Sequence, residues 1–170
     1  MADVMRKVKD FRADPAGIRE FAVDASVQVE IGDLLWLNGD DVRPASHTSL
    51  WTGGLAGTQG NLAQKFVGVA MSAINSTSAG FVRVATRGTF KFTVTTAATF
   101  EVGNLISGSR DGSNNYLLDQ AVDKLTDNQT NQGLAIGRVT KRETVATTQV
   151  EFEILSSVAP GGGYKAFLAS

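Results

Sequence analysis

Short apolar segments separated by turn-forming residues run through most of this chain, and they predict a strand-rich protein. The segments 89–94 and 148–155 alternate apolar with polar residues, so each is expected to bury one face and expose the other. The segment 66–71 is apolar on both faces, which predicts a central strand. Further strands are predicted at 18–23, 27–30, 33–37, 81–85, 100–106, 116–118 and 134–140.

Helical spacing is much rarer than strand spacing. Residues 58–65 place Leu62 four positions before Phe66, which predicts a helix of two turns. Residues 3–11 have a similar spacing and predict a short amphipathic helix. The polar segments 107–115 and 123–133 are rich in turn formers and are predicted to be loops.

One sequence phrase occurs twice. Glu-Ile-Gly-Asp-Leu-Leu at 30–35 returns as Glu-Val-Gly-Asn-Leu-Ile at 101–106. Each copy is followed, after a similar interval, by an apolar segment with a central glycine, at 67–70 and at 136–139. A repeat with its glycines in register indicates a duplicated small β unit.

A tight turn explains the composition of the repeated phrase. Gly32 and Gly103 can adopt a positive φ without a Cβ clash, and Asp33 and Asn104 can bond nearby backbone groups to stabilise the turn. The β-branched residue before each glycine and the aliphatic pair after the turn are expected to face the core. These four turn residues are therefore predicted to be structural.

The predicted fold class is mainly β, a small β-barrel or β-sandwich with pseudo-duplicated strand-turn-strand units, one short helix and extended terminal arms. The expected organisation is an N-terminal arm at 1–17, a β-barrel body at 18–157 and a tail at 158–170. Three consecutive glycines at 161–163 make that tail a hinged one.

Composition narrows the choice of partner. Sixteen basic and 17 acidic residues give a net charge of −1, so the chain has no basic surplus to neutralise phosphates or to bind an anionic membrane. We therefore predict neither nucleic acid nor a membrane as a partner. There are no cysteines, which rules out disulfides and thiolate metal sites. The first fourteen residues lack an apolar core segment and are not expected to be a signal peptide.

No catalytic constellation is recognisable in the sequence. His47 is the only imidazole, no Gly-x-Ser-x-Gly motif accompanies it, and we expect it to be a loop residue. Asp40 and Asp41 lack the spacing of a calcium loop and are expected to form a hairpin turn. The prediction is a non-enzymatic protein without a cofactor or a metal.

The order of glycine-centred strands resembles that of the tailed-phage capsid decoration, or cement, proteins of the small β-barrel kind. The similar stretch runs from about Val27 to Leu155, most of the chain. The segments that carry the resemblance are 31–35, 66–70, 80–90, 102–106, 135–139 and 150–155. The chain departs from the pattern by a longer N-terminal segment and by a tail after Pro160.

This resemblance implies a structural protein that binds the outer surface of an icosahedral capsid and reinforces it. The implied partner is the major capsid protein, and the implied assembly is a homo-oligomer, with a trimer favoured by a three-fold capsid site. The implied location is the virion, after synthesis in the host cytoplasm. Two other classes remain open: another virion subunit, such as a tail-tube or capsid protein, and a carbohydrate- or ligand-binding β module with Trp51 and Tyr116 as stacking platforms.

A cement protein must bridge capsid subunits, so contact area outside its barrel is expected. The N-terminal arm combines basic with apolar residues, and the tail carries apolar residues beyond its glycine hinge. Trp51, in a loop, is either an exposed anchor or a cap on its own barrel. The candidate partner-contact residues are Arg6, Val8, Phe11, Trp51, Tyr164, Phe167 and Leu168.

Overall fold

The computed structural model describes residues 12–13, 17–75 and 77–158. Strands predominate among these residues, and only one of the described helices is longer than four residues. The strands are β1 Arg12–Ala13, β2 Ile18–Val23, β3 Leu34–Asn38, β4 Asp41–Pro44, β5 Phe66–Ala70, β6 Gly80–Ala85, β7 Gly88–Phe100, β8 Leu105–Arg110, β9 Leu117–Lys124, β10 Gly137–Val139 and β11 Glu143–Ile154. The helices are η2 Thr48–Leu50, α2 Leu55–Lys65 and α3 Gln129–Gln132.

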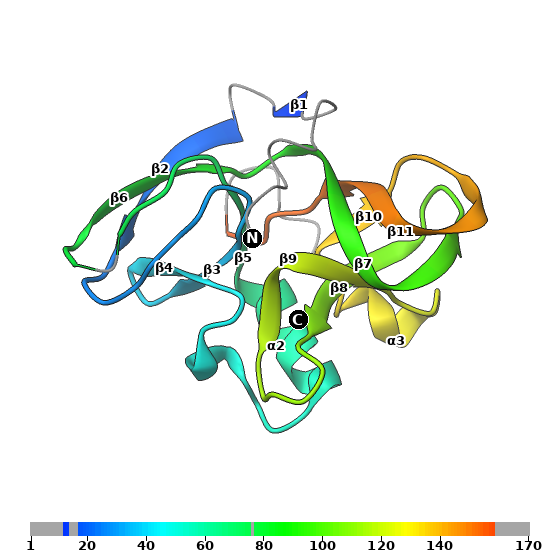
Figure 1. Ribbon diagram of the computed structural model, residues 1–170, viewed down its shortest axis with the longest axis horizontal. Coiled ribbons are helices and arrows are strands. Elements are labelled where there is room, and N and C mark those ends of the chain that lie inside the picture. Colours follow the sequence, from blue (N-terminus) through cyan, green and yellow to red (C-terminus); the bar gives the residue numbers. More distant parts are fainter. Residues whose placement is uncertain (1–11, 14–16, 76, 159–170) are drawn as a thin grey trace.

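The strands form two barrels that lie side by side (Figure 1). The first barrel closes in the order β2-β4-β3-β5-β6. The second has the order β7-β9-β8-β10-β11, closed by antiparallel pairing of β11 with β7, and β1 adds to its β7. The predicted mainly β, barrel-type fold with a duplicated unit is confirmed, and each copy of the repeated phrase lies in its own barrel.

The two barrels have the same topology and the same register. In each, the first and third strands pair in parallel, Ala22 with Asp41 and Thr93 with Ala121, while all other pairs are antiparallel. The partners of the second strand also correspond. Leu35 lies opposite Pro44 and Gly68, and Ile106 lies opposite Lys124 and Gly137. Residues of one barrel can therefore be matched one by one with residues of the other.

The two copies of the repeated phrase form equivalent turns. Gly32 and Gly103 have φ angles of 97° and 92°, in the region that favours glycine. The backbone N–H of residue 30 donates to Asp33 Oδ2 at 2.8 Å, and that of residue 101 donates to Asn104 Oδ1 at 2.8 Å. Each glycine N–H then donates to the fourth strand of its barrel, to the carbonyl of residue 70 in β5 or of residue 139 in β10. Each turn thus fastens one strand to another within its barrel.

The expectation that the residue before each glycine faces inward is wrong. Ile31 is 36% exposed and Val102 is 67% exposed. The aliphatic pairs after the turns are buried, but neighbouring residues of a strand point to opposite faces, so the two members of a pair enter different clusters. In the first copy, Leu35 enters the interior of its own barrel, whereas Leu34 packs against the second barrel.

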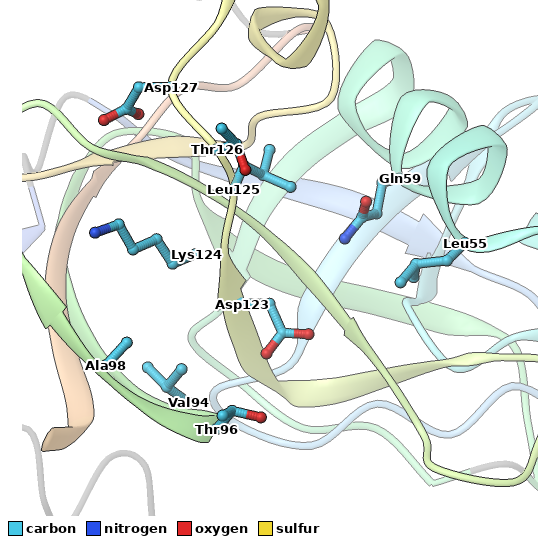
Figure 2. A pocket seen from close by; sticks show the side chains of 10 residues that line it. All are labelled: Leu55, Gln59, Val94, Thr96, Ala98, Asp123, Lys124, Leu125, Thr126 and Asp127. Atoms are coloured by element: carbon cyan, nitrogen blue, oxygen red, sulfur yellow. The ribbon is translucent and has the colours of Figure 1, made fainter. Parts of the chain in front are cut away.

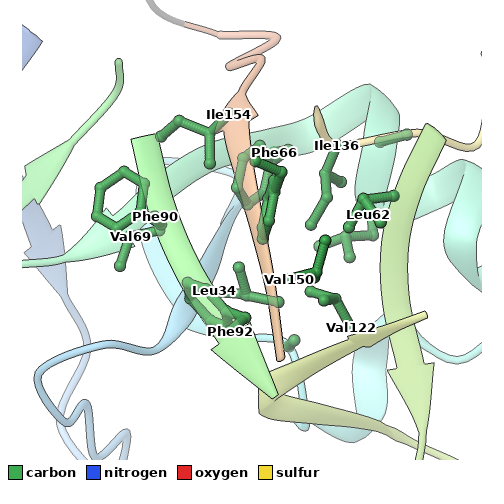
Figure 3. Packing of buried hydrophobic residues seen from close by; sticks show 14 of the residues in the cluster. Leu34, Leu62, Phe66, Val69, Phe90, Phe92, Val122, Ile136, Val150 and Ile154 are labelled. Carbon is green, nitrogen blue, oxygen red and sulfur yellow. The ribbon is translucent and has the colours of Figure 1, made fainter. Parts of the chain in front are cut away.

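Two large hydrophobic clusters follow from this arrangement. One fills the first barrel and consists of Val23, Val27, Val29, Leu35, Val42, Val67, Ala70, Val82 and Val84. The other fills the second barrel and extends to the outer face of the first, where Leu34 and Val69 lie in one cluster with Phe90 and Phe92 (Figure 3). The barrels are joined by buried apolar surface, which stabilises one particular arrangement of the two.

Helix α2 is the second link between the barrels. It begins three residues earlier than predicted, and its buried residues include Gln59, Leu62 and Ala63. Gln59 Nε2 donates to the carbonyl of Gly108 in β8 at 2.9 Å, so a helix from the first barrel covers the second. The matching helix of the second barrel, α3, has four residues and buries none of them. None of the described helices has the length and apolarity needed to span a bilayer.

The prediction of a loop at 107–115 is partly wrong. Strand β8 continues to Arg110, and Ser107, Gly108 and Ser109 are buried. The hydroxyls of the two serines find partners inside the protein: that of Ser107 donates to the carbonyl of Leu134 at 2.6 Å, and that of Ser109 lies 3.0 Å from the Thr95 hydroxyl. Turn-forming composition was misleading because small residues are also needed where α2 approaches the strand.

Candidate functional site

A hollow of about 800 Å³ lies where the two barrels meet, and we call it the junction hollow. Its residues from the first barrel are Gln28, Glu30, Asp33, Pro44 and Ser46, and those from the second are Thr93, Leu118, Asp119, Gln120 and Ala121. The repeated turn supplies one wall and the start of β9 the other. The junction hollow is therefore lined by both barrels, at the place where they contact each other.

Two sets of hydrogen bonds cross the junction hollow. The backbone N–H and the hydroxyl of Ser46 donate to the two carboxylate oxygens of Asp119, at 2.6 and 2.8 Å. Gln120 Nε2 donates to Asp33 Oδ1 at 2.8 Å. Two neighbouring residues of β9 are thereby bonded to two separate segments of the first barrel.

Burial changes the acidity of both carboxyl groups. Asp33 is 3% exposed, and its pKa is raised to about 6, mainly by burial, with a smaller contribution from the charge of Asp119. The hydrogen bonds from Glu30 N–H and Gln120 act against this rise. Burial also raises the pKa of Asp119, and its bonds from Ser46 oppose that change. Asp33, in the wall of the junction hollow, therefore gains and loses its proton at mildly acidic pH.

A second hollow, of about 710 Å³, lies beside the second barrel, and we call it the open groove (Figure 2). Its residues are Leu55 and Gln59 from α2, Val94, Thr96 and Ala98 from β7, and Asp123 to Asp127 at and after the end of β9. The groove exists because β7 and β9 pair only at 93–94 with 121–122 and then separate. Lys124 extends across the opening, where its Nζ donates to the carbonyl of Thr99 at 3.0 Å.

His47 has structural partners on both ring nitrogens. Its Nε2 lies 2.9 Å from Arg43 Nη1, which can only donate, so Nε2 accepts. Its Nδ1 lies 2.7 Å from the Ser49 hydroxyl. Partial burial and the charge of Arg43 lower the pKa of His47. The ring is held as a neutral loop residue, and the described residues include no group of three or more acidic, cysteine or histidine side chains placed to bind a metal.

Trp51 follows η2 in the first barrel and contacts a residue of the second. Its side chain is half-buried, and the guanidinium of Arg110, at the end of β8, lies 5.2 Å from the ring centroid. Tyr116, the other aromatic proposed as a stacking platform, accepts a hydrogen bond from Asn114 Nδ2 at 3.0 Å. The remaining candidate contacts, Arg6, Val8, Phe11, Tyr164, Phe167 and Leu168, lie outside the described residues.

Sequence reasoning missed two exposed apolar side chains, Phe81 in β6 and Val145 in β11, which are 69% and 76% exposed. The signal for Phe81 was present in the alternation of its strand. Val82 and Val84 share one face and are buried, so Phe81 must share the other face with Arg83. Large exposed apolar side chains are candidate contacts with a partner.

Comparisons with known proteins found a distant likeness among solved structures. No sequence-defined protein family matches the chain, and no curated protein sequence matches it. Among solved structures, the N base of the head fiber gp8.5 of bacteriophage phi29 aligns with 81% of this chain and 93% of its own, at 14% identity and a TM-score of 0.42.

Proposed function

We propose that this chain is a non-enzymatic structural subunit of a phage virion that binds the outside of the capsid and reinforces it. The observation that carries the proposal is the sequence resemblance to capsid decoration proteins, because its glycine-centred segments form the strands of both barrels. Gly68 and Gly137 are the clearest examples. A Cβ on either would collide with a carbonyl oxygen of the next strand, of Ala85 or of Glu153.

The architecture is suited to a reinforcing role. The two barrels share a continuous hydrophobic cluster, and the polar side chains of His47 and Asp119 are bonded to structural partners. Exposed apolar side chains on β6 and β11 offer contact area, and the terminal arms are the proposed capsid contacts. The implied partner is a major capsid protein.

Co-sedimentation with expanded capsids of the phage that encodes the chain tests this proposal. We expect saturable binding, and capsids carrying the protein should withstand heating that disrupts bare capsids. Phe11→Ala and Phe167→Ala should weaken binding, whereas the control Ser113→Ala, at an exposed position of the turn between β8 and β9, should not. A wild-type chain that stays in the supernatant with intact capsids would refute capsid binding.

A further inference from the structure

The short pairing of β7 with β9 separates the two hollows. The strands pair at 93–94 with 121–122 and diverge on both sides of that point. Thr93 and residues 118–121, which precede the divergence point, line the junction hollow. Val94 and residues 123–127, which follow it, line the open groove. The first part of β7 therefore leads to the junction hollow.

Strand β1 lies on the edge of β7 that leads to this hollow. β11 pairs with residues 89–93 of β7 along one edge, so β1 and β9 share the other edge. Because β1 is antiparallel to β7, with Arg12 opposite Thr89, a continuation of β1 before Arg12 would run along β7 toward Thr93. No described strand pairs with residues 91–92 on this edge, and β9 occupies it from Thr93 onward. Such a continuation would therefore end at the junction hollow.

The residues that precede β1 in the sequence match the edge that they would cover. Directly opposite residues of an antiparallel pair lie on the same face of the sheet. The register places Phe11 opposite Phe90, which is buried, and Asp10 opposite Lys91, which is half-buried. Lys91 would then lie between Asp10 and Glu151 of β11, so that charge alternates across three strands.

The junction hollow is acidic. Glu30, Asp33 and Asp119 line it, and its described lining includes no lysine or arginine. Burial is the main reason that the pKa values of both aspartates are raised, and the charge of Glu30 adds to the rise in each. The hydrogen-bond donors to the two aspartates are neutral: the Gln120 amide, the Ser46 hydroxyl and backbone N–H groups. A cationic segment is the electrostatic complement of this hollow.

We propose that the N-terminal arm lengthens β1 along β7 and brings Lys7 and Lys9 to the carboxylates of the junction hollow. Side chains of an extended segment alternate between two faces, so the two lysines share the face of Phe11, and Arg6 and Val8 share the opposite face. Arg6 and Val8 thus remain available to a capsid. The docking is a property of the free chain and does not rest on capsid binding.

Disulfide trapping tests the register, and the chain contains no cysteine of its own. Asp10→Cys with Lys91→Cys should form an intramolecular disulfide on mild oxidation, because directly opposite Cβ atoms lie about 4.5–5.5 Å apart, close to the separation that a disulfide requires. The matched control combines Asp10→Cys with Thr96→Cys, an exposed position about 17 Å further along β7. Mass spectrometry should find the first pair oxidised and the control pair reduced. Equal oxidation of the two pairs, or a first pair that stays reduced, would overturn the docking.

Trypsin cleavage of the free chain tests the charges. The bonds after Lys7 and Lys9 should be cut slowly in the wild type and about fivefold faster after Glu30→Lys, which places a like charge in the hollow. Glu20→Lys, at an exposed position of β2, is the matched control and should be cut as the wild type is. Circular dichroism and thermal unfolding should show both variants folded. Equal cleavage of the two variants would overturn the contact between the lysines and the hollow, whatever the result of the capsid-binding experiment.

Discussion

Ser46 in the first barrel and Asp119 in the second are joined by two parallel hydrogen bonds, one from the backbone N–H and one from the hydroxyl of the serine. A carboxylate with both oxygens bonded in this way fixes an orientation as well as a distance. The pair therefore fixes the position of β9 relative to the segment after β4, beside the apolar contact that joins the barrels.

Removing the carboxylate should destabilise the junction. Asp119→Ala leaves the partly buried N–H and hydroxyl of Ser46 without their acceptor, so we expect the free energy of unfolding to fall by about 1–3 kcal/mol. Chemical denaturation measures this loss. Ser113→Ala, on an exposed turn, is the control and should change stability little. Equal effects of the two substitutions would argue against a stabilising role for the Ser46–Asp119 pair.

Asp33 should make stability depend on pH. Its folded pKa of about 6 lies above its ordinary value of 3.8, so the folded protein holds the proton more tightly than the unfolded chain. The contribution of Asp33 is therefore largest below pH 4, falls as the pH rises from 4 to 6, and is then constant. The total fall is about 3 kcal/mol.

Asp33→Asn isolates this effect, because the second barrel already uses Asn104 at the equivalent turn position. The asparagine keeps an oxygen for the Glu30 N–H, and the Gln120 amide can turn to accept from its nitrogen. We expect the variant to be more stable than the wild type above pH 6 and to lose that advantage near pH 4. Denaturant titrations at several pH values measure the difference, and a difference that is constant with pH would contradict the raised pKa.

The glycines of β5 and β10 should tolerate no side chain. A Cβ at Gly68 would collide with the Ala85 carbonyl, and one at Gly137 would collide with the Glu153 carbonyl and the Phe152 ring. Gly68→Ala and Gly137→Ala should each cost more than about 2 kcal/mol or prevent folding. Gly112→Ala is the matched control, since its Cβ would meet open space. Thermal unfolding of the three variants gives the comparison, and a Gly137→Ala chain as stable as Gly112→Ala would contradict the close approach.

Gly103 isolates the cost of backbone conformation. It has a φ of 92°, and a Cβ there would meet nothing within 4 Å. Gly103→Ala should therefore destabilise by about 1–2 kcal/mol through φ alone, and Gly103→Asn should cost less because asparagine tolerates the left-handed region better. Chemical denaturation should show the wild type as the most stable chain, Gly103→Asn as the next and Gly103→Ala as the least stable. The reverse ranking would show that the turn does not require this conformation.

The continuous hydrophobic cluster should make the two barrels unfold together. Leu34 belongs to the first barrel but packs among residues of the second, so Leu34→Ala should cost about 2–5 kcal/mol. Hydrogen exchange followed by NMR should then show reduced protection in both barrels. Reduced protection confined to the first barrel would mean that the barrels unfold independently.

Much of the fold follows from local pattern. Alternation at 89–94 and 148–155 identifies strands because side chains of a strand alternate between two faces, and the repeated phrase identifies two glycine turns because few other residues adopt a positive φ. Prediction from local pattern failed where the amino-acid composition of a segment was compatible with two kinds of structure. Small polar residues at 107–110 suit a loop, but they also suit a strand on which a helix packs closely.

The sequence by itself determined most of the strands, the two turns and the presence of a duplicated unit, since each depends on residues close together along the chain. Only the tertiary structure decided that each copy closes its own barrel, that α2 of the first barrel covers the second, and that Asp33 and Asp119 meet partners across the junction hollow. Such contacts join residues far apart in the chain, and their stability comes from burial and hydrogen bonding after folding, which a local pattern does not encode.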